Sequence, residues 1–129
     1  MKRVLGKSGI EVSAVGMGCW AIGGVWAFDG ASAGWSTVEC RESDRAIRES
    51  LDLGVAFFDT AAAYGCGHSE KILGAALAGH RDLAVVATKF GHRIDPETKN
   101  ATAYGTSERE SDVVPHMRRD LETSLTADQ

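Results

Sequence analysis

Two apolar segments that end in ionisable side chains constrain the fold of this chain most strongly. Residues 55–59 end in Asp59, and residues 83–90 carry Lys89 near their end. Tyr64 follows the first segment in a glycine-bounded loop. Continuous apolar runs are typical of parallel strands covered on both faces, and neighbouring parallel strands end at the same edge of a sheet. We therefore expect these three side chains to converge at one edge.

Helical patterns separate the predicted strands. One helix is predicted to begin at Ser36, because Ser36 and Glu39 have the spacing of a capping box, and to end at Gly54, which permits a left-handed stop. Residues 69–77 predict a second, shorter helix that ends at Gly79. The residues expected on the inward faces of the two helices are Cys40, Ser43, Ile47, Leu51, Ile72, Leu73, Ala76 and Leu77.

The N-terminal region predicts a β-hairpin and a further strand. Residues 2–5 and 10–15 flank a turn in which Gly6 and Gly9 permit positive φ, and this pattern favours a hairpin. Residues 14–20 form a short apolar run, where we expect the first core strand. The alternation of strand and helix then predicts parallel α/β architecture, which a doubly wound sheet and a (β/α)8 barrel both satisfy.

Two segments, residues 21–35 and 91–111, predict loops, because they are rich in residues that interrupt regular structure. A third helix is predicted to begin at Ser111 or Asp112. Its shared apolar face consists of Val114, Met117, Leu121 and Leu125.

Composition and charge exclude several classes of function. The formal net charge is -4 and the basic residues are scattered, so no basic stripe suits a nucleic acid. No segment approaches the roughly 18 apolar residues of a membrane helix, and the basic N-terminus lacks the apolar core of a signal peptide. The 3 cysteines are odd in number and widely spaced, which favours a reducing compartment. We expect a cytoplasmic protein.

A metal site is not expected. Cys66 and His68 could form half of one, but no second ligand pair with suitable spacing is present. An inert thiol and a loop histidine are the simpler interpretation.

The three converging side chains suit proton transfer. Taken singly, each has a structural interpretation: Asp59 as a cap, Lys89 as a rim lysine and Tyr64 as a packing residue. A phenol ordinarily ionises at about pH 10 and acts as an acid near neutrality only where a cation favours the phenolate. The combination would protonate a carbonyl oxygen while a nucleophile attacks its carbon. No side-chain nucleophile has a convincing base, so we expect a hydride from a nicotinamide cofactor.

Residues 16–21 superficially fit the glycine fingerprint of a dinucleotide-binding fold. A helix should begin directly after that motif, but Gly23, Gly24 and an aromatic loop follow. The Rossmann hypothesis is therefore the weaker one.

Four motifs in the same order resemble the N-terminal portion of the aldo-keto reductases. They are residues 18–24, 51–65, 67–77 and 87–90. The resemblance extends from the hairpin to about Leu125. It implies an α/β fold of the (β/α)8 TIM-barrel type, here incomplete, with an N-terminal β-hairpin and about three βα units. It also implies the reduction of an aldehyde or ketone with NADPH.

The resemblance implies roles for residues at matching positions. Tyr64 would donate the proton, Lys89 would favour its release, and Asp59 would orient Lys89. The residues that would border the cofactor are Gly18, Cys19 and Trp20. The residues that would line the substrate pocket are Trp26, Phe28 and Trp35. For these last three, packing within the loop is an equally good explanation.

The chain departs from the family pattern after the third core strand. The catalytic histidine of the family follows strand four, and no histidine of this chain lies in a matching motif. The four are His68, His80, His92 and His116. We therefore expect residues 1–129 to be the N-terminal part of the domain, truncated before strand four, and the isolated chain to be inactive.

Two alternatives remain open. The chain could be a non-catalytic fragment that self-associates, or pairs with a chain supplying the missing strands, because three βα units cannot close an eight-stranded barrel. Lys89 could instead form a Schiff base with a carbonyl compound, without a nicotinamide cofactor.

Overall fold

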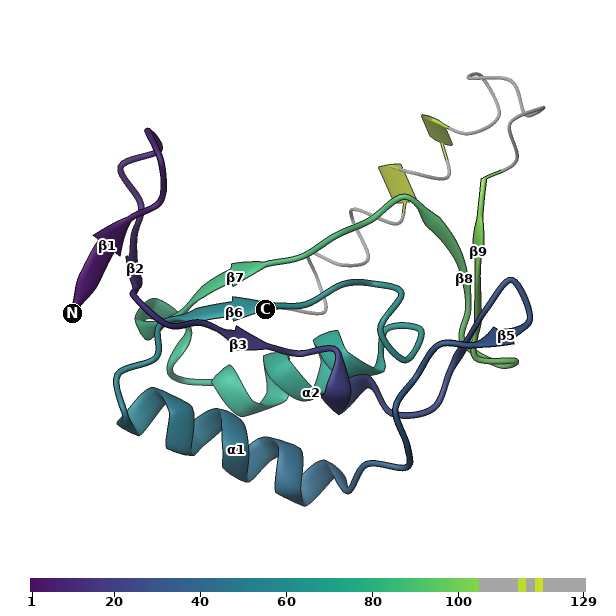
Figure 1. Ribbon diagram of the computed structural model, residues 1–129, viewed down its shortest axis with the longest axis horizontal. Coiled ribbons are helices and arrows are strands. Elements are labelled where there is room, and N and C mark those ends of the chain that lie inside the picture. The colour runs from purple at the N-terminus through teal and green to yellow at the C-terminus, as the bar shows by residue number, and fades with distance from the viewer. Residues whose placement is uncertain (105–113, 116–117, 120–129) are drawn as a thin grey trace.

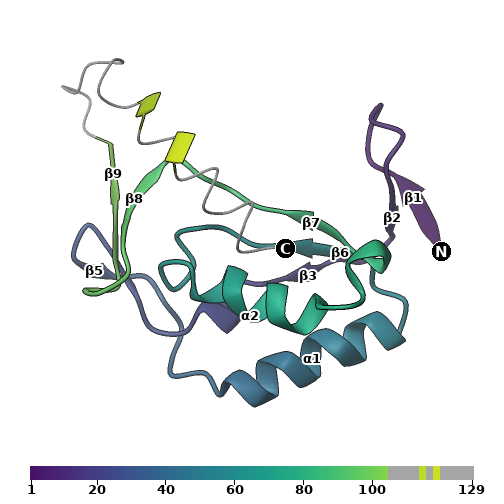
Figure 2. The same ribbon diagram turned by 180° about the vertical axis from the view of Figure 1, so that it is seen from behind.

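The computed structural model of the chain describes residues 1–104, 114–115 and 118–119 (Figure 1). At its centre lies a parallel sheet, and helices lie beneath this sheet in Figure 1. A hairpin lies at the amino ends of the parallel strands, and a second sheet lies at their carboxyl ends. Figure 2 shows the same arrangement from behind. The carboxyl ends of the strands are therefore enclosed from one side by the second sheet.

Within the described residues, the parallel sheet has three strands in the order β3-β6-β7. They are β3 (Met17–Gly18), β6 (Phe57–Asp59) and β7 (Val85–Ala87). The register pairs Phe58 with Met17 on one side and with Val86 on the other. These three side chains pack into the core against the helices. Because successive side chains of a strand point to opposite faces, Asp59 lies on the face that the helices do not cover.

Each core strand lies inside a segment that the sequence predicts as a strand, and each is shorter than predicted. The prediction for residues 83–90 is wrong at its start, because the short helix η2 (Arg81–Leu83) leads into β7. The β6–β7 ladder pairs Asp59 with Ala87 as its last partners. Lys89 therefore lies just beyond the ladder rather than inside a strand.

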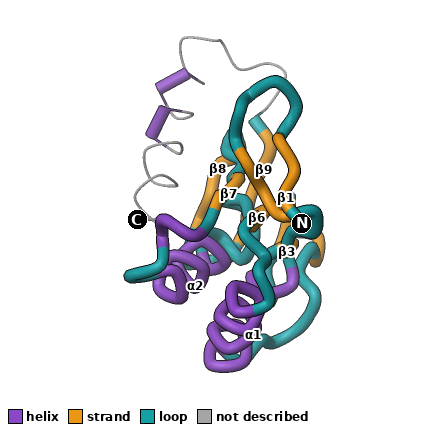
Figure 3. The backbone as a smooth tube through the Cα atoms, turned by 90° about the vertical axis from the view of Figure 1, so that its left-hand side faces the viewer, coloured by secondary structure: helices purple, strands orange, loops and turns teal. Residues whose placement is uncertain are grey.

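The helices α1 (Cys40–Asp52) and α2 (His68–Leu77) contact each other and lie on the same side of the strands (Figure 3). The predicted stop signals are confirmed, since Gly54 and Gly79 both have positive φ. Glycine adopts that backbone conformation without the steric penalty that a Cβ atom imposes.

The predicted start of α1 at Ser36 is wrong. Glu39 is the N-cap residue, and no side-chain hydrogen bond caps the helix. The Ser36 hydroxyl instead donates a hydrogen bond to the carbonyl oxygen of Thr37, its neighbour. Because Ser36 precedes the N-cap residue Glu39, it lies outside the first turn of α1. Ser36 and Glu39 therefore do not form a capping box.

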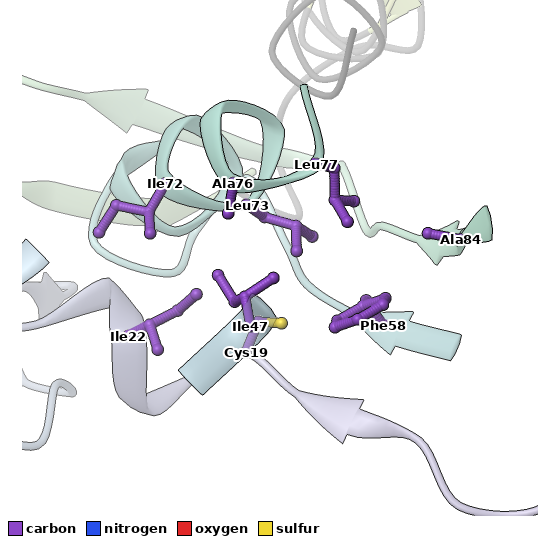
Figure 4. Close-up of a cluster of buried hydrophobic side chains, with 9 residues drawn as sticks. All are labelled: Cys19, Ile22, Ile47, Phe58, Ile72, Leu73, Ala76, Leu77 and Ala84. Atoms are coloured by element: carbon purple, nitrogen blue, oxygen red, sulfur yellow. The ribbon is translucent and has the colours of Figure 1, made fainter. Parts of the chain in front are cut away.

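The main hydrophobic core lies between the parallel sheet and the helices (Figure 4). Its buried members are Cys19, Ile22, Ile47, Phe58, Ile72, Leu73, Ala76, Leu77 and Ala84. The predicted inward faces are confirmed for Ile47 and for the apolar residues of α2, and Leu51 packs against the cluster. Cys40 is exposed, contrary to the prediction, because it is the first residue of α1 and lies at the end of the helix.

The predicted N-terminal hairpin is confirmed. It consists of β1 (Lys2–Val4) and β2 (Glu11–Ser13), which pair in antiparallel fashion. Gly6 and Gly9 both have positive φ in the connecting turn, at 56° and 76°. The hairpin connects to the sheet through Ser13, whose hydroxyl accepts a hydrogen bond from the backbone N–H of Ala56.

A second sheet corrects the prediction that residues 21–35 and 91–111 are loops throughout. Within the described residues it has four strands in the order β5-β4-β9-β8. These strands are β4 (Ala27–Phe28), β5 (Ala31–Ser32), β8 (His92–Asp95) and β9 (Asn100–Ala103). A 3-10 turn, η1 (Ala21–Gly23), precedes them. The decisive pairing is β4 with β9, between segments far apart in the chain, so no local sequence pattern reveals it.

The predicted third helix lies mostly outside the described residues, as do Met117, Leu121 and Leu125 of its predicted apolar face. Val114 is described and is exposed. Throughout the described part of the chain, no helix has the length and apolar character that crossing a membrane requires.

We expect Leu73→Ala to destabilise the chain by about 2–5 kcal/mol, because it removes a fully buried side chain from the centre of the core. Leu53 offers a matched control, since the same substitution there changes a side chain that is 85% exposed. Urea denaturation followed by circular dichroism measures both effects. Equal losses of stability in the two variants would contradict this description of the core.

Candidate active site

The carboxyl ends of β6 and β7 bring a carboxylate and an ammonium group together. Lys89 Nζ donates hydrogen bonds to Asp59 Oδ1 at 2.6 Å and to the Thr60 carbonyl oxygen at 2.9 Å. The backbone supports this contact, because the N–H of Thr60 donates to the carbonyl of Ala87 and that of Ala62 donates to the carbonyl of Lys89. The position of Lys89 beside Asp59 therefore follows from the way the two strand ends pair.

Tyr64 completes the group that the sequence predicts. Lys89 Nζ lies 5.2 Å from the centroid of the Tyr64 ring. The loop that carries Tyr64 is held against η1, where a Cβ atom on Gly65 would lie 2.0 Å from the carbonyl oxygen of Gly23. Gly65 also has a φ of 63°. Both observations require glycine at position 65, and this close approach holds Tyr64 at the rim.

Competing effects determine the charge of Lys89. Partial burial would lower its pKa, but the hydrogen bond to Asp59 and the interactions with Tyr64 and Asp59 outweigh burial and raise the pKa above its ordinary value. Lys89 and Asp59 remain 53% and 44% exposed, so solvent screens the pair and its contribution to folding stability is small. The ion pair is therefore better suited to orientation than to stability.

An open cleft of about 710 Å³ adjoins this group through Tyr64, which lines the cleft and lies beside Lys89. Its lining residues are Trp20, Trp26, Phe28, Ser32, Ala33, Gly34, Trp35 and Tyr64. The ring centroids of Trp20 and Trp35 are 5.6 Å apart, in an edge-to-face arrangement. Those of Trp20 and Tyr64 are 6.4 Å apart. The structure thus places the predicted pocket aromatics Trp26, Phe28 and Trp35 in one cleft with Tyr64.

The second sheet positions one wall of the cleft. Phe28 lies on β4 and pairs with Ala101 of β9. Ala101 is fully buried and belongs to the same small apolar cluster as Trp26. The side-chain oxygen of Asn100 accepts a hydrogen bond from the N–H of Gly30, in the turn between β4 and β5. The indole Nε1 of Trp26 is buried without a hydrogen-bond partner in the described structure. The cleft therefore contains an aromatic wall supported by backbone pairing.

The three residues predicted to border a cofactor are not equivalent. Gly18 pairs with Asp59 in the register and is exposed, and a Cβ atom there would meet nothing within 4 Å. Trp20 is partly exposed and lines the cleft. Cys19 lies between them with its side chain fully buried in the main core (Figure 4). The structure therefore brings Gly18 and Trp20 to the rim, whereas the Cys19 side chain points away from it.

Sequence reasoning missed the small residues of the cleft, Ser32, Ala33 and Gly34. The sequence gives little indication of these residues, because they contribute backbone surface to the cleft rather than reactive side chains. Gly34 is required sterically, since a Cβ atom there would lie 2.1 Å from the carbonyl oxygen of Gly24.

The described histidines do not join the Asp59–Lys89 pair. His68 Nε2 lies 3.8 Å from Cys40 Sγ, and His92 packs edge-on against Phe28 with ring centroids 5.2 Å apart. Burial lowers the pKa of His68, with smaller contributions from nearby lysines. No group of three or more possible metal ligands occurs among the described residues.

Comparison with known proteins identifies the class of this fold. An aldo-keto reductase from Bacillus halodurans in its holo form superposes with a TM-score of 0.74 at 26% identity, covering 99% of this chain and 36% of that one. The glycerol dehydrogenase from Gluconobacter oxydans gives a TM-score of 0.70 at 32% identity, covering 98% and 35%. The fold is thus an incomplete (β/α)8 barrel with an N-terminal hairpin, as the sequence predicts.

The family model for the aldo/keto reductase family matches residues 14–127. The chain belongs to this family of oxidoreductases. A third structure, an aldo-keto reductase from Klebsiella pneumoniae in complex with NADPH, shares the fold with a TM-score of 0.61 at 24% identity, covering 92% of this chain and 32% of that one.

Curated relatives include two bacterial proteins. The aldo-keto reductase YhdN of Bacillus subtilis is 41% identical over 87 residues, which cover 66% of this chain and 24% of the relative. Pyridoxal 4-dehydrogenase of Microbacterium luteolum is 33% identical over 101 residues, covering 78% and 27%. The chain therefore spans about a quarter of the length of the curated relatives it matches.

We expect Asp59→Asn to lower the pKa of Lys89, because the charged hydrogen-bond acceptor that raises it is lost. In the unaltered chain, the proton bound to Lys89 stabilises the fold at pH values below the ordinary lysine pKa. This contribution is lost as the pH rises through the raised pKa of Lys89 in the folded chain. NMR titration of the Lys89 side chain measures the shift. Glu42→Gln, which removes a partner of Arg45 on α1, is the control and should leave Lys89 unchanged.

An unchanged Lys89 titration in Asp59→Asn would show that the ion pair does not determine the charge of this lysine.

Proposed function

We propose that this chain contributes the catalytic rim and substrate cleft of an NADPH-dependent aldo-keto reductase, which reduces an aldehyde or ketone to an alcohol. The observation that carries the proposal is the contact of Lys89 with Asp59 and Tyr64 beside the aromatic cleft. Membership of the aldo/keto reductase family supports it.

The proposed mechanism is proton donation to a carbonyl oxygen. The Tyr64 hydroxyl donates the proton, and the Lys89 ammonium favours its release by stabilising the phenolate. Asp59 holds Lys89 in place through the hydrogen bond at 2.6 Å. NADPH, when bound, supplies the hydride that the carbonyl carbon accepts.

The rim fits a nicotinamide cofactor at two positions. Gly18 offers open backbone surface beside Asp59, and Trp20 offers a partly exposed ring. A flat aromatic side chain is suited to packing against a planar ring system. Cys19 would contribute through its backbone at most, because its side chain is buried in the core. The NADPH complex of the Klebsiella pneumoniae protein supports this choice of cofactor.

The cleft fits a small carbonyl substrate. Trp26, Phe28 and Trp35 provide apolar walls, and Ser32 is the polar side chain among the lining residues apart from Tyr64 and the indole N–H groups. Clefts of this size and lining bind small molecules mainly through apolar contact. The cytoplasmic location expected from the sequence remains a prediction.

The Schiff-base alternative is disfavoured by the charge of Lys89. A lysine attacks a carbonyl carbon only as the neutral amine, and the raised pKa keeps Lys89 protonated at neutral pH. Borohydride trapping with an aldehyde should therefore leave Lys89 unlabelled.

The isolated chain and a chimera test the proposed function together. We expect a chimera in which residues 14–104 replace the matching segment of the Bacillus subtilis relative to reduce aldehydes with NADPH. Tyr64→Phe should lower kcat by about 10²–10⁴-fold, because it removes the proton donor. Tyr104→Phe is the matched control and should have little effect. The isolated chain should show no measurable reduction, and activity in the chimera that survives Tyr64→Phe would contradict the proposal.

A second candidate function is supported by the edges of the parallel sheet. Within the described residues, β3 and β7 each pair with β6 alone, so one edge of each strand is unpaired. Unpaired strand edges favour pairing with another chain. The candidate is a non-catalytic protein that pairs with a second copy of itself through these edges.

If this second candidate is correct, the isolated chain should sediment as a dimer or larger assembly at micromolar concentration, with mass increasing as concentration rises. Sedimentation velocity combined with circular dichroism measures association and folding in the same sample. A well-folded monomer across the concentration range would eliminate this candidate and leave the reductase proposal unaffected.

A further inference from the structure

The first turn of α2 contains a buried carboxylate that the proposed reaction does not use. Glu70 is 2% exposed, and its Oε1 accepts a hydrogen bond of 2.6 Å from the Thr88 hydroxyl. Burying a carboxylate is costly unless hydrogen bonds compensate. The start of a helix favours negative charge, which offsets part of this cost. Through the hydrogen bond with Thr88, the Glu70 carboxylate holds the end of β7 against α2.

The residue before Glu70 holds the neighbouring strand end. The Ser69 hydroxyl donates a hydrogen bond of 2.8 Å to the Cys19 carbonyl oxygen and lies 2.9 Å from the Thr60 hydroxyl. Both Ser69 and Thr60 are fully buried. Two consecutive residues of α2 therefore contact the ends of the parallel strands. Ser69 contacts the residues that follow β3 and β6, and Glu70 contacts the residue that follows β7.

These contacts lie directly beside the Asp59–Lys89 ion pair along the chain. Thr60 follows Asp59, and Thr88 precedes Lys89. Successive side chains in an extended backbone point to opposite faces. Holding Thr60 and Thr88 on the helix side therefore directs Asp59 and Lys89 to the opposite side. The carbonyl of Thr60 adds a direct contact, because it accepts a hydrogen bond from Lys89 Nζ.

We propose that Glu70 is a positioning residue, which acts through the Thr88 hydroxyl to hold the Lys89 ammonium against Asp59. Its importance for catalysis rests on the proposed function, but its effect on Lys89 is measurable without turnover. Glu70 itself touches neither the cleft nor the ion pair in the contacts described for it. The contact that matters is the hydrogen bond from Thr88.

A matched pair of substitutions at Thr88 tests the inference. Thr88→Val preserves the shape of the side chain but removes the hydroxyl, whereas Thr88→Ser retains it. Competitive acetylation of the chain, with Lys71 as the internal reference, reports how firmly Lys89 is held as a protonated, paired amine. We expect Thr88→Val to increase the relative labelling of Lys89 by about threefold or more, which corresponds to about half a pKa unit. Thr88→Ser should remain close to the unaltered chain.

Two further variants separate positioning from general stability. Glu70→Gln keeps an acceptor oxygen for Thr88, so it should change Lys89 labelling less than Glu70→Ala does. Ser50→Ala removes a hydroxyl that bonds to the Ala46 carbonyl on α1, and it should leave Lys89 unchanged even if stability falls. If Glu70→Ala does not fold, the Thr88 pair decides the question alone.

Unchanged labelling of Lys89 in a folded Thr88→Val variant would overturn the positioning role. That outcome would leave the proposed function intact, provided that turnover of the chimera still depends on Tyr64. Conversely, the chimera could remain active in Tyr64→Phe while Thr88→Val still increases the labelling of Lys89. That result would contradict the proposed function but support the positioning role of Glu70.

Discussion

The parallel pairing of β6 with β7 is the constraint on which the site depends. Its register sets Phe58 beside Val86, and both pack against the helices. Because side chains alternate along each strand, that same register turns Asp59 to the uncovered face. Lys89 follows β7 closely enough to meet it at 2.6 Å. A slip of one residue would move the apolar side chains out of the core and separate the ion pair, so core packing and site geometry are coupled.

Local sequence patterns predict the parts of the fold whose causes are local. The turn glycines of the hairpin, the apolar face of α2 and the stop at Gly54 are all determined by neighbouring residues. The pairing of β4 with β9 joins segments far apart in the chain, and its short strands carry no sustained periodicity. The start of α1 also differs, because Ser36 bonds to its neighbour and leaves Glu39 as the N-cap.

In the site, too, features with local causes can be predicted from the sequence, whereas features that depend on distant contacts cannot. The convergence of Asp59, Lys89 and Tyr64 follows from strand order and reactive residue types, which a sequence displays. The burial of Cys19 depends on side-chain alternation at the end of a two-residue strand, where a small change in backbone decides the face. The contact between Glu70 and Thr88 joins a helix to a strand end, and neither residue type indicates it. The reactive residues of the site can therefore be predicted from the sequence more readily than the contacts that hold them in place.

The hydrogen bond from Lys89 to Asp59 places a cation beside Tyr64. The most direct measurement is the scalar coupling across that hydrogen bond, between the side-chain nitrogen of Lys89 and the carboxyl carbon of Asp59, in an isotopically labelled chain. We expect a resolved coupling for this pair and none for the exposed Lys2–Glu11 pair, whose heavy atoms are 3.4 Å apart. A Lys89 signal without coupling, with the averaged shifts of a freely rotating lysine, would show that Asp59 does not hold the Lys89 ammonium.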